Sequence, residues 1–161
     1  MESPENETEA AYLKCRTRIQ PLVKMAEESG AVLTIEPYWR NVINSVERTQ
    51  RLLSEIKSPA LKVVMGPCNY YRNADLQKLQ PILDEIFRQV GERTVVAHAK
   101  DVKASADGPD LPAAGLGVMD YPLYLRLLAG LDRPLYLVLE HLGMEDVSRA
   151  RNYVLRKFDR I

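Results

Sequence analysis

The sequence is poor in the residues on which small disulfide-rich domains and zinc modules depend. It has two cysteines, Cys15 and Cys68, among 161 residues, too few for a disulfide framework or a zinc-finger spacing. It also lacks an excess of charge of either sign, because 22 Lys and Arg balance 22 Asp and Glu. A net charge of zero argues against nucleic-acid binding driven by neutralisation of phosphates. A chain of this length buries a core large enough to fold without disulfides or a structural metal.

Long apolar runs are missing as well. No stretch approaches the roughly 20 consecutive apolar residues of a membrane span. The first ten residues, MESPENETEA, are acidic and lack the apolar stretch of a signal peptide. The sequence therefore predicts a soluble, cytoplasmic protein with no membrane or nucleic-acid partner. No low-complexity segment or flexible linker divides the chain, so residues 1–161 are expected to form a single domain.

The sequence does contain an alternation of short apolar runs with longer helical stretches. Each run is nearly continuously apolar, which is typical of a strand buried on both faces. The runs span residues 31–36, 61–65, 95–99 and 135–140. Apolar residues recur at helical spacing in residues 7–28, 44–56, 75–90, 120–130 and 145–158. This order predicts an α/β fold of parallel strands with helical crossovers, either an open doubly wound sheet or an arc of a (β/α)8 barrel.

The predicted helices carry boundary signals. Pro21 lies inside the first helical stretch and predicts a kink or a break there. Asn44, followed three positions later by Glu47, has the spacing of a capping box. Asp75 and Asp120 are expected to begin the next two helices.

Polar groups stand at three of the four predicted strand ends. These ends are Glu36, Gly66, His98 and Glu140. The chemistry of a barrel gathers at the C-terminal ends of its strands, and two carboxylates with an imidazole suit Mg2+, Mn2+ or Zn2+. Such a metal polarises a carbonyl while the glutamates exchange protons with the adjacent carbon. Each residue taken alone is equally explained by an ion pair, a helix cap or a buried hydrogen-bonded histidine, but three in register favour a functional site.

Several segments carry a family resemblance. They are LTIEP at 33–37, SPALKVVMGPCN at 58–69, VVAHAKD at 95–101, GLGVMDYPLYLRLL at 115–128 and LYLVLE at 135–140. In order and spacing they resemble the sugar phosphate isomerase/epimerase family, the xylose isomerase-like TIM barrels. The resemblance covers nearly all of residues 7–158 and corresponds to strands five to eight. It implies the C-terminal half of a (β/α)8 barrel that lacks its N-terminal half.

The resemblance also implies a reaction. Members of this family isomerise or epimerise a sugar or sugar phosphate, using one divalent metal and a glutamate pair that relays protons through an enediolate. Carried over by position, Glu36 and Glu140 are the acid/base pair and two of the metal ligands, and His98 is the imidazole ligand. Asn69 and Lys100 fall where substrate contacts are expected.

Four further features lie near these residues. The segment Tyr38-Trp39-Arg40-Asn41 either stacks on and hydrogen-bonds a sugar, with Trp39 as the expected substrate contact, or its aromatics only cover the barrel mouth. Asp101 is expected at the mouth beside the proposed substrate lysine. The segment GLG at 115–117 is a phosphate site or, more simply, a glycine turn that feeds a helix. His141 is expected to point away from Glu140, because neighbouring side chains alternate along a strand.

The second strand end departs from the family pattern. Gly66 opens the segment GPCN, where the family has a motif resembling D-P-x-N, so one anionic ligand is missing and metal binding is expected to be weakened or lost. Cys68 could ligate a softer metal, but a buried structural thiol is the simpler interpretation. Tyr121, Tyr124 and Tyr136 are interpreted as packing residues.

The number of predicted strands also differs from that of a complete barrel of this family. A complete barrel usually needs about 250 residues, and four strands leave two open edges and an uncovered apolar interior. The chain is therefore expected to form a homo-oligomer or to associate with the missing barrel half. A catalytically inactive truncated barrel, acting as a binding or assembly module, is the alternative to the enzyme. An abasic-site nuclease is disfavoured, because two histidines and a neutral chain are poor in ligands and in DNA-facing charge.

Overall fold

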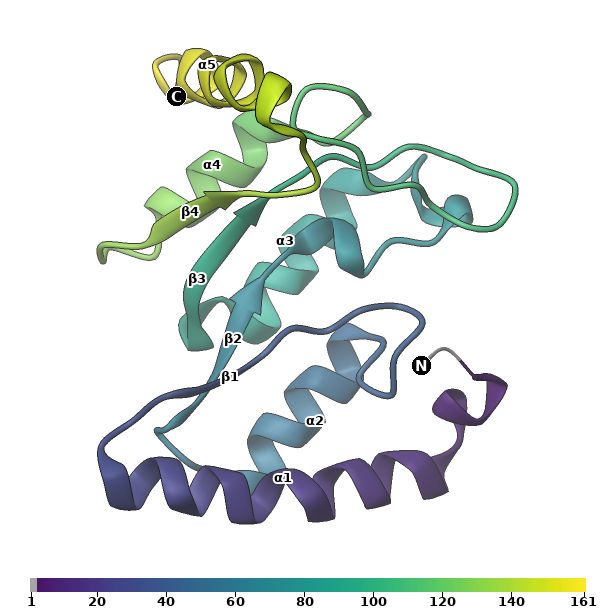
Figure 1. Ribbon diagram of the computed structural model, residues 1–161, viewed down its shortest axis with the longest axis vertical. Helices are drawn as coiled ribbons and strands as arrows, with labels where there is room; N and C mark the ends of the chain where they lie inside the picture. The colour runs from purple at the N-terminus through teal and green to yellow at the C-terminus, as the bar shows by residue number, and fades with distance from the viewer. Residues whose placement is uncertain (1–2) are drawn as a thin grey trace.

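Four parallel strands form one sheet in the computed structural model, which describes residues 3–161 (Figure 1). The strands are β1 (Leu33–Ile35), β2 (Leu61–Met65), β3 (Thr94–Ala99) and β4 (Tyr136–Leu139). Their order in the sheet is their order in the chain, and every neighbouring pair is parallel. A doubly wound sheet reverses its strand order at a switch point, so the observed order is that of a barrel segment.

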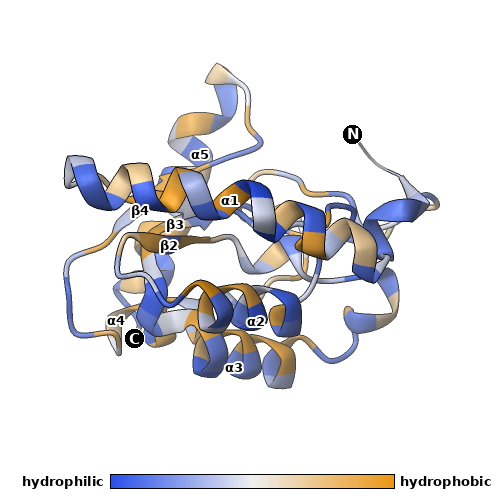
Figure 2. Ribbon diagram, turned by 90° about the horizontal axis from the view of Figure 1, so that it is seen from below, coloured by the Kyte–Doolittle hydropathy of each residue, from blue (hydrophilic) through white to orange (hydrophobic). Residues whose placement is uncertain are grey.

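The helices follow an arc around the sheet. They are α1 (Glu9–Ser29), α2 (Val46–Ile56), α3 (Leu79–Val90), α4 (Tyr121–Ala129) and α5 (Val147–Phe158). Figure 1 shows α1 and α5 at opposite ends of the molecule, and Figure 2 shows α2 and α3 on one side of the strands with α1 and α5 on the other. This curvature is that of part of a (β/α)8 barrel. Within residues 3–161, no helix has the length and apolar character needed to cross a membrane.

The core lies between the sheet and the helices. Leu61, Val63 and Met65 are fully buried and alternate with half-buried Lys62 and Val64. Because successive side chains of a strand point to opposite faces, one face of β2 packs on the helices and the other faces the inside of the arc. The helices contribute apolar side chains to the same core, among them Leu52, Leu83, Ile86, Tyr121 and Tyr124.

The inner face of the sheet is largely uncovered. The strand register aligns Val64, Val96 and Tyr136 in one row and His98 with Val138 in the next. Tyr136 is 80% exposed and Val138 is 43% exposed. The prediction that every strand is buried on both faces is therefore wrong for β4, and Tyr136 is not a packing residue. In a closed barrel these side chains fill the interior, so their exposure follows from the sheet being open.

Two helix starts differ from the predicted positions. The residue before α2 is Ser45, whose hydroxyl accepts a backbone N–H from the first turn, so the capping box predicted at Asn44 is wrong. Helix α3 begins at Leu79, because Asp75 belongs to a separate 3-10 turn and its carboxylate bonds the backbone there. Asp120 does cap α4 as predicted.

The first helix runs unbroken through Pro21, so the break predicted there is wrong. A proline inside a helix removes one backbone hydrogen bond and crowds the preceding turn. Pro21 lies on the exposed side of α1, where water can reach the carbonyl that its missing N–H leaves without a helical partner.

Candidate active site

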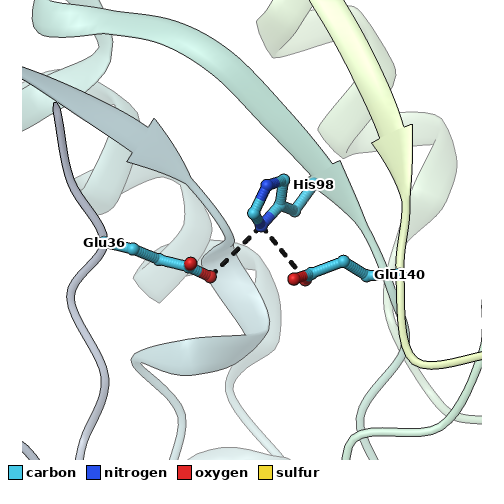
Figure 3. Close-up of side chains that lie close together, drawn as sticks. All are labelled: Glu36, His98 and Glu140. Atoms are coloured by element: carbon cyan, nitrogen blue, oxygen red, sulfur yellow. Dashed lines mark hydrogen bonds and ion pairs between the residues drawn. The ribbon is translucent and has the colours of Figure 1, made fainter.

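Three side chains converge at the carboxyl edge of the sheet (Figure 3). His98 Nδ1 lies 3.1 Å from Glu36 Oε1 and 3.0 Å from Glu140 Oε2. One donor atom from each residue lies within 4.8 Å of the other two. The convergence follows from the parallel fold, because Glu36 and Glu140 directly follow β1 and β4 while His98 stands near the end of β3.

The donor set fits a divalent cation. Ligands at adjacent corners of an octahedron with metal–oxygen distances of about 2.1 Å lie about 3.0 Å apart. The two nitrogen–oxygen distances in this cluster, 3.1 and 3.0 Å, are those of direct contacts between the side chains and are also compatible with that separation. Carboxylate oxygens and an imidazole nitrogen are ligands that Mg2+, Mn2+ and Zn2+ accept. Three protein ligands also leave coordination positions for water or substrate.

A buried lysine joins the cluster. Lys100 is 3% exposed, and its Nζ lies 2.5 Å from Glu140 Oε2 and 3.4 Å from Glu36 Oε1. It follows His98 by two residues and therefore projects from the same face of the sheet. The two carboxylates thus share one ammonium group.

Asn69 occupies the space beside Gly66. Its Nδ2 donates to Glu36 Oε1 at 2.8 Å. A Cβ added at Gly66 would lie 3.1 Å from that nitrogen and 3.5 Å from Glu36 Oε1, so any side chain at this position enters the cluster. The φ of Gly66 is −116°, which every residue type adopts. Gly66 therefore offers no ligand atom to the site, although its backbone conformation does not require glycine.

The surroundings of Glu36 favour its carboxylate form. Burial opposes ionisation, but the charge of Lys100, the hydrogen bond from Asn69 and the nearby His98 outweigh it. The pKa of Glu36 is consequently lowered from its ordinary value. An anionic glutamate is the form that binds a cation or accepts a proton.

Glu36, Asn69, Lys100 and Glu140 line a cavity of about 350 Å³, a size typical of small-molecule sites. Its wall also includes Tyr38 and Asn41, from the segment considered for sugar contacts, and Leu111 and His141, which the sequence did not assign to the site. The prediction that His141 points away from Glu140 is wrong, because His141 has a φ of 54° and strand alternation ends before it. Only its position next to Glu140 could have indicated this role.

Trp39 lies apart from this cavity. It faces Gly108, whose φ of 108° and missing side chain allow the close approach, since a Cβ there would lie 2.5 Å from the indole. The guanidinium of Arg40 lies over the ring, 4.4 Å from its centre. The Trp39 backbone N–H donates to the Asn69 carbonyl at 2.9 Å. Trp39 therefore braces the rim, and Tyr38 is the aromatic residue that lines the cavity.

Asp101 supports the site from within the fold, not from the mouth where it was expected. Its fully buried carboxylate accepts backbone N–H groups of Val102, Gly115 and Met119 at 2.8 to 2.9 Å. A Cβ on Gly117 would lie 2.5 Å from Asp101 Oδ1. The glycines of the GLG segment thus let the loop close around this carboxylate, as a glycine turn does.

Two tyrosines and a thiol hold the strand ends in place. The hydroxyl of Tyr124 donates to the carbonyl of His98, and that of Tyr121 donates to the carbonyl of Lys100, each at 3.0 Å. Cys68 Sγ donates to the same Lys100 carbonyl at 3.3 Å. Cys68 is the buried thiol that the sequence predicted, and burial raises its pKa. The backbone from which the cluster projects is therefore tied to α4 and to the end of β2.

Comparison with solved structures shows the same fold at low sequence identity. A xylose isomerase-like TIM barrel protein from Mycobacterium smegmatis in complex with magnesium is 17% identical, with a TM-score of 0.70, covering 99% of this chain and 57% of that one. A D-tagatose 3-epimerase-like protein is 16% identical, with a TM-score of 0.71 and coverages of 89% and 53%. The 3-keto-D-glucoside 4-epimerase of E. coli is 18% identical, with a TM-score of 0.59 and coverages of 91% and 52%.

This chain thus spans a little over half the length of the structures it matches. No curated protein matches it. The sequence profile described as xylose isomerase-like TIM barrel matches residues 2–157, which is nearly the whole chain. The predicted half of a (β/α)8 barrel is confirmed by this match and by the parallel sheet. The chain belongs to the xylose isomerase-like TIM barrel family.

Proposed function

We propose that this chain carries the catalytic metal site of a sugar or sugar-phosphate isomerase or epimerase. The observation that carries the proposal is the convergence of Glu36, His98 and Glu140, each of which offers a ligand atom within 4.8 Å of the other two. The structures similar to this chain include an epimerase and an epimerase-like protein, which supports the same chemistry.

The glutamates carry the proton transfers in this proposal. A divalent cation held by Glu36, His98 and Glu140, with Mn2+, Mg2+ and Zn2+ as candidates, would supply Lewis acidity toward the sugar carbonyl. Glu36, held as an anion, removes a proton from the carbon beside that carbonyl and leaves an enediolate. Glu140, on the other side of His98, delivers a proton taken up from solvent to the same carbon for epimerisation. For isomerisation it delivers that proton to the neighbouring carbon, and the proton of the hydroxyl beside the carbonyl passes to the former carbonyl oxygen. One proton leaves and one returns, so no co-substrate is consumed.

Substrate contacts come from the cavity wall. Asn69 and Lys100 line the cavity and are proposed to bind sugar oxygens. The stacking role considered for Trp39 fits Tyr38 better, because Tyr38 lines the cavity and Trp39 braces the rim behind it.

Hydrogen exchange with solvent tests the proposal without knowledge of the natural sugar. The protein is incubated with Mn2+ and a panel of ketoses in D2O, and loss of the C–H signal beside the carbonyl is followed by NMR. We expect exchange, together with formation of an epimer or isomer, for at least one sugar. Glu140→Gln should reduce the rate by at least about a hundredfold, whereas Glu145→Gln, an exposed carboxylate five residues later, should not. Equal exchange by both variants would contradict the assignment.

An inactive barrel half is the second candidate function, and Gly66 is the observation that favours it. It leaves the cluster without a carboxylate at the second strand end. If no sugar in the panel exchanges hydrogen while the chain still binds a complementary barrel half, the assembly-module interpretation is correct.

We also propose what completes the sheet. In a (β/α)8 barrel a helix covers each junction between neighbouring strands. Here α1 flanks the open edge at β1 and α5 flanks the open edge at β4. Two copies joined at these edges would bring α5 of one copy and α1 of the other to the same junction. A barrel half of four strands and three connecting helices has no helix outside its first and last strands, so each junction would keep one helix. A complementary barrel half therefore fits the open edges better than a second copy of this chain.

The free thiols Cys15 and Cys68 agree with the cytoplasmic location that we propose for this activity.

A further inference from the structure

Lys100 touches the same carboxylate oxygens that face the imidazole. Glu140 Oε2 lies 3.0 Å from His98 Nδ1 and 2.5 Å from Lys100 Nζ. Glu36 Oε1 lies 3.1 Å from the imidazole nitrogen and 3.4 Å from the ammonium. A metal bound by Glu36, His98 and Glu140 would use these two oxygens, so the ammonium and the metal need the same atoms.

Because Lys100 is buried, its ammonium depends on the neighbouring carboxylates. The side chain of Lys100 is 2% exposed, and a buried ammonium is tolerated only when it is paired with opposite charge. Two neighbouring carboxylates in turn repel each other unless a positive charge lies near both. Each partner therefore compensates the charge of the others. The hydrogen bonds from Tyr121 and Cys68 to the Lys100 carbonyl fix where the lysine side chain starts.

We propose that Lys100 is a resident cation that competes with a divalent metal for Glu36 and Glu140. Metal binding then requires the ammonium to withdraw from Glu140 Oε2, and the lysine sets the metal affinity of the site. The inference rests on the proposed function, because it concerns the same ligands. Gly66 strengthens the effect: with two carboxylates and one ammonium the cluster carries a formal charge of −1, and no third carboxylate offsets the lysine.

Titration with Mn2+ by calorimetry tests the competition. The variants are Lys100→Met, which removes the charge, and Lys100→Gln, which keeps an N–H donor without charge. The matched control is Lys103→Met, a half-exposed lysine three residues later that pairs with Asp110 at 3.2 Å. We expect both Lys100 variants to bind Mn2+ at least about tenfold more tightly than the unmodified protein, since a positive charge within about 4 Å of a dication is strongly repulsive. Lys103→Met should change the affinity less than about twofold, because an exposed charge is screened by solvent.

Thermal unfolding without metal provides a second readout. Loss of the ammonium leaves the carboxylates uncompensated, so Lys100→Met should lower Tm in the absence of Mn2+, and Mn2+ should restore it. Failure of both Lys100 variants to fold even with Mn2+ would overturn the proposal.

The outcomes separate this inference from the proposed function. If the unmodified protein binds Mn2+ but the Lys100 variants bind it no more tightly, the competition is wrong and the metal site stands. If only the Lys100 variants bind Mn2+, the competition is correct and the metal-dependent function of the unmodified chain is wrong. If none of them binds Mn2+, both are wrong.

Discussion

A single oxygen, Oε1 of Glu36, has three nitrogen neighbours. Asn69 Nδ2 lies at 2.8 Å, His98 Nδ1 at 3.1 Å and Lys100 Nζ at 3.4 Å. Hydrogen bonds to a carboxylate stabilise the charged form, so Glu36 is held as an anion that can bind a cation. A metal that binds Glu36 Oε1 must displace one or more of these nitrogen groups. Because Gly66 has no side chain, the metal gains one ligand fewer in exchange.

Gly66→Asp should therefore strengthen metal binding. The φ of −116° accepts any residue, and the new Cβ needs Asn69 Nδ2, 3.1 Å away, to shift by a few tenths of an ångström. A fourth ligand, and a third anionic one, should tighten Mn2+ binding at least about tenfold, by the charge argument that holds for other carboxylate sites. Calorimetric titration measures the change. Gly66→Ala is the control, which adds the Cβ alone and should bind no more tightly than the unmodified chain. Equal effects of both variants would show that the gain is not due to a ligand.

At the scale of elements, Glu55 makes several of the polar contacts between α1 and α2. Glu55 accepts hydrogen bonds from Arg16 and Arg51, each at 2.7 Å, and from the Tyr12 hydroxyl at 3.1 Å. These hydrogen bonds lower the pKa of Glu55 from 4.5 to about 2, against a smaller opposing effect of desolvation. Helix α1 covers the β1 edge, so this polar cluster helps to hold one end of the arc.

The stabilising effect of Glu55 should vanish in acid. A carboxyl whose pKa is lower in the folded than in the unfolded state stabilises the fold above the unfolded value, and the effect is lost as pH falls through the folded value. Glu55→Gln should therefore lower Tm at pH 7, and its difference from the unmodified protein should shrink between pH 4.5 and about 2. Thermal unfolding across this range measures it. Glu28→Gln, whose exposed partner Lys24 lies 3.7 Å away, is the control and should have little effect at any pH. A constant difference for Glu55→Gln would contradict the assigned cause.

Helix α1 should also be more stable without its proline. Pro21 costs a backbone hydrogen bond in the middle of an exposed helix face. Pro21→Ala should raise the free energy of unfolding by about 1–3 kcal/mol, since a proline in a helix interior costs about 3 kcal/mol relative to alanine. Denaturant unfolding measures this. Gln20→Ala, at the neighbouring exposed position, should stay within about 0.5 kcal/mol of the unmodified chain. A loss of stability in Pro21→Ala would show that the helix uses the proline, for example to set its bend.

At the scale of the whole molecule, the open sheet is the dominant feature. The inner face presents Val96, Val138 and Tyr136 between two unpaired strand edges. Exposed apolar surface next to free edges promotes association. The cluster of Glu36, His98 and Glu140 stands at the rim of this same face, so strands that closed the barrel would also complete its cavity.

A complementary half should bind this face. We expect the chain to form a one-to-one complex with a separately expressed four-strand first half of a barrel of this family, observed by sedimentation velocity. Val138→Lys should weaken the complex at least about tenfold, because a charge in a barrel interior is not solvated. Leu116→Lys, an exposed apolar residue in the loop before α4, should leave it unchanged. A stable monomer that does not bind the added half, or a symmetric dimer of this chain, would contradict the proposal.

Much of this architecture could be predicted from local patterns. The four apolar runs became four strands in chain order, and Asp120 caps its helix. The predictions failed at one choice between adjacent residues and at one position that depends on neighbours distant in the sequence. Ser45 displaced the expected cap because its hydroxyl reaches the first-turn N–H. Tyr136 is exposed because no further strand covers the inside of the arc.

The sequence by itself determined the order of strands and helices and the presence of Glu36, His98 and Glu140 at strand ends, because periodicity and strand position are local properties of a chain. Only the tertiary structure decided that Lys100 lies between the two glutamates and that His141 lines the cavity while Trp39 does not. Those outcomes depend on side chains from separate strands meeting at one edge and on a left-handed backbone at His141. Contacts of this kind are set by how the sheet curves, which no short stretch of sequence specifies.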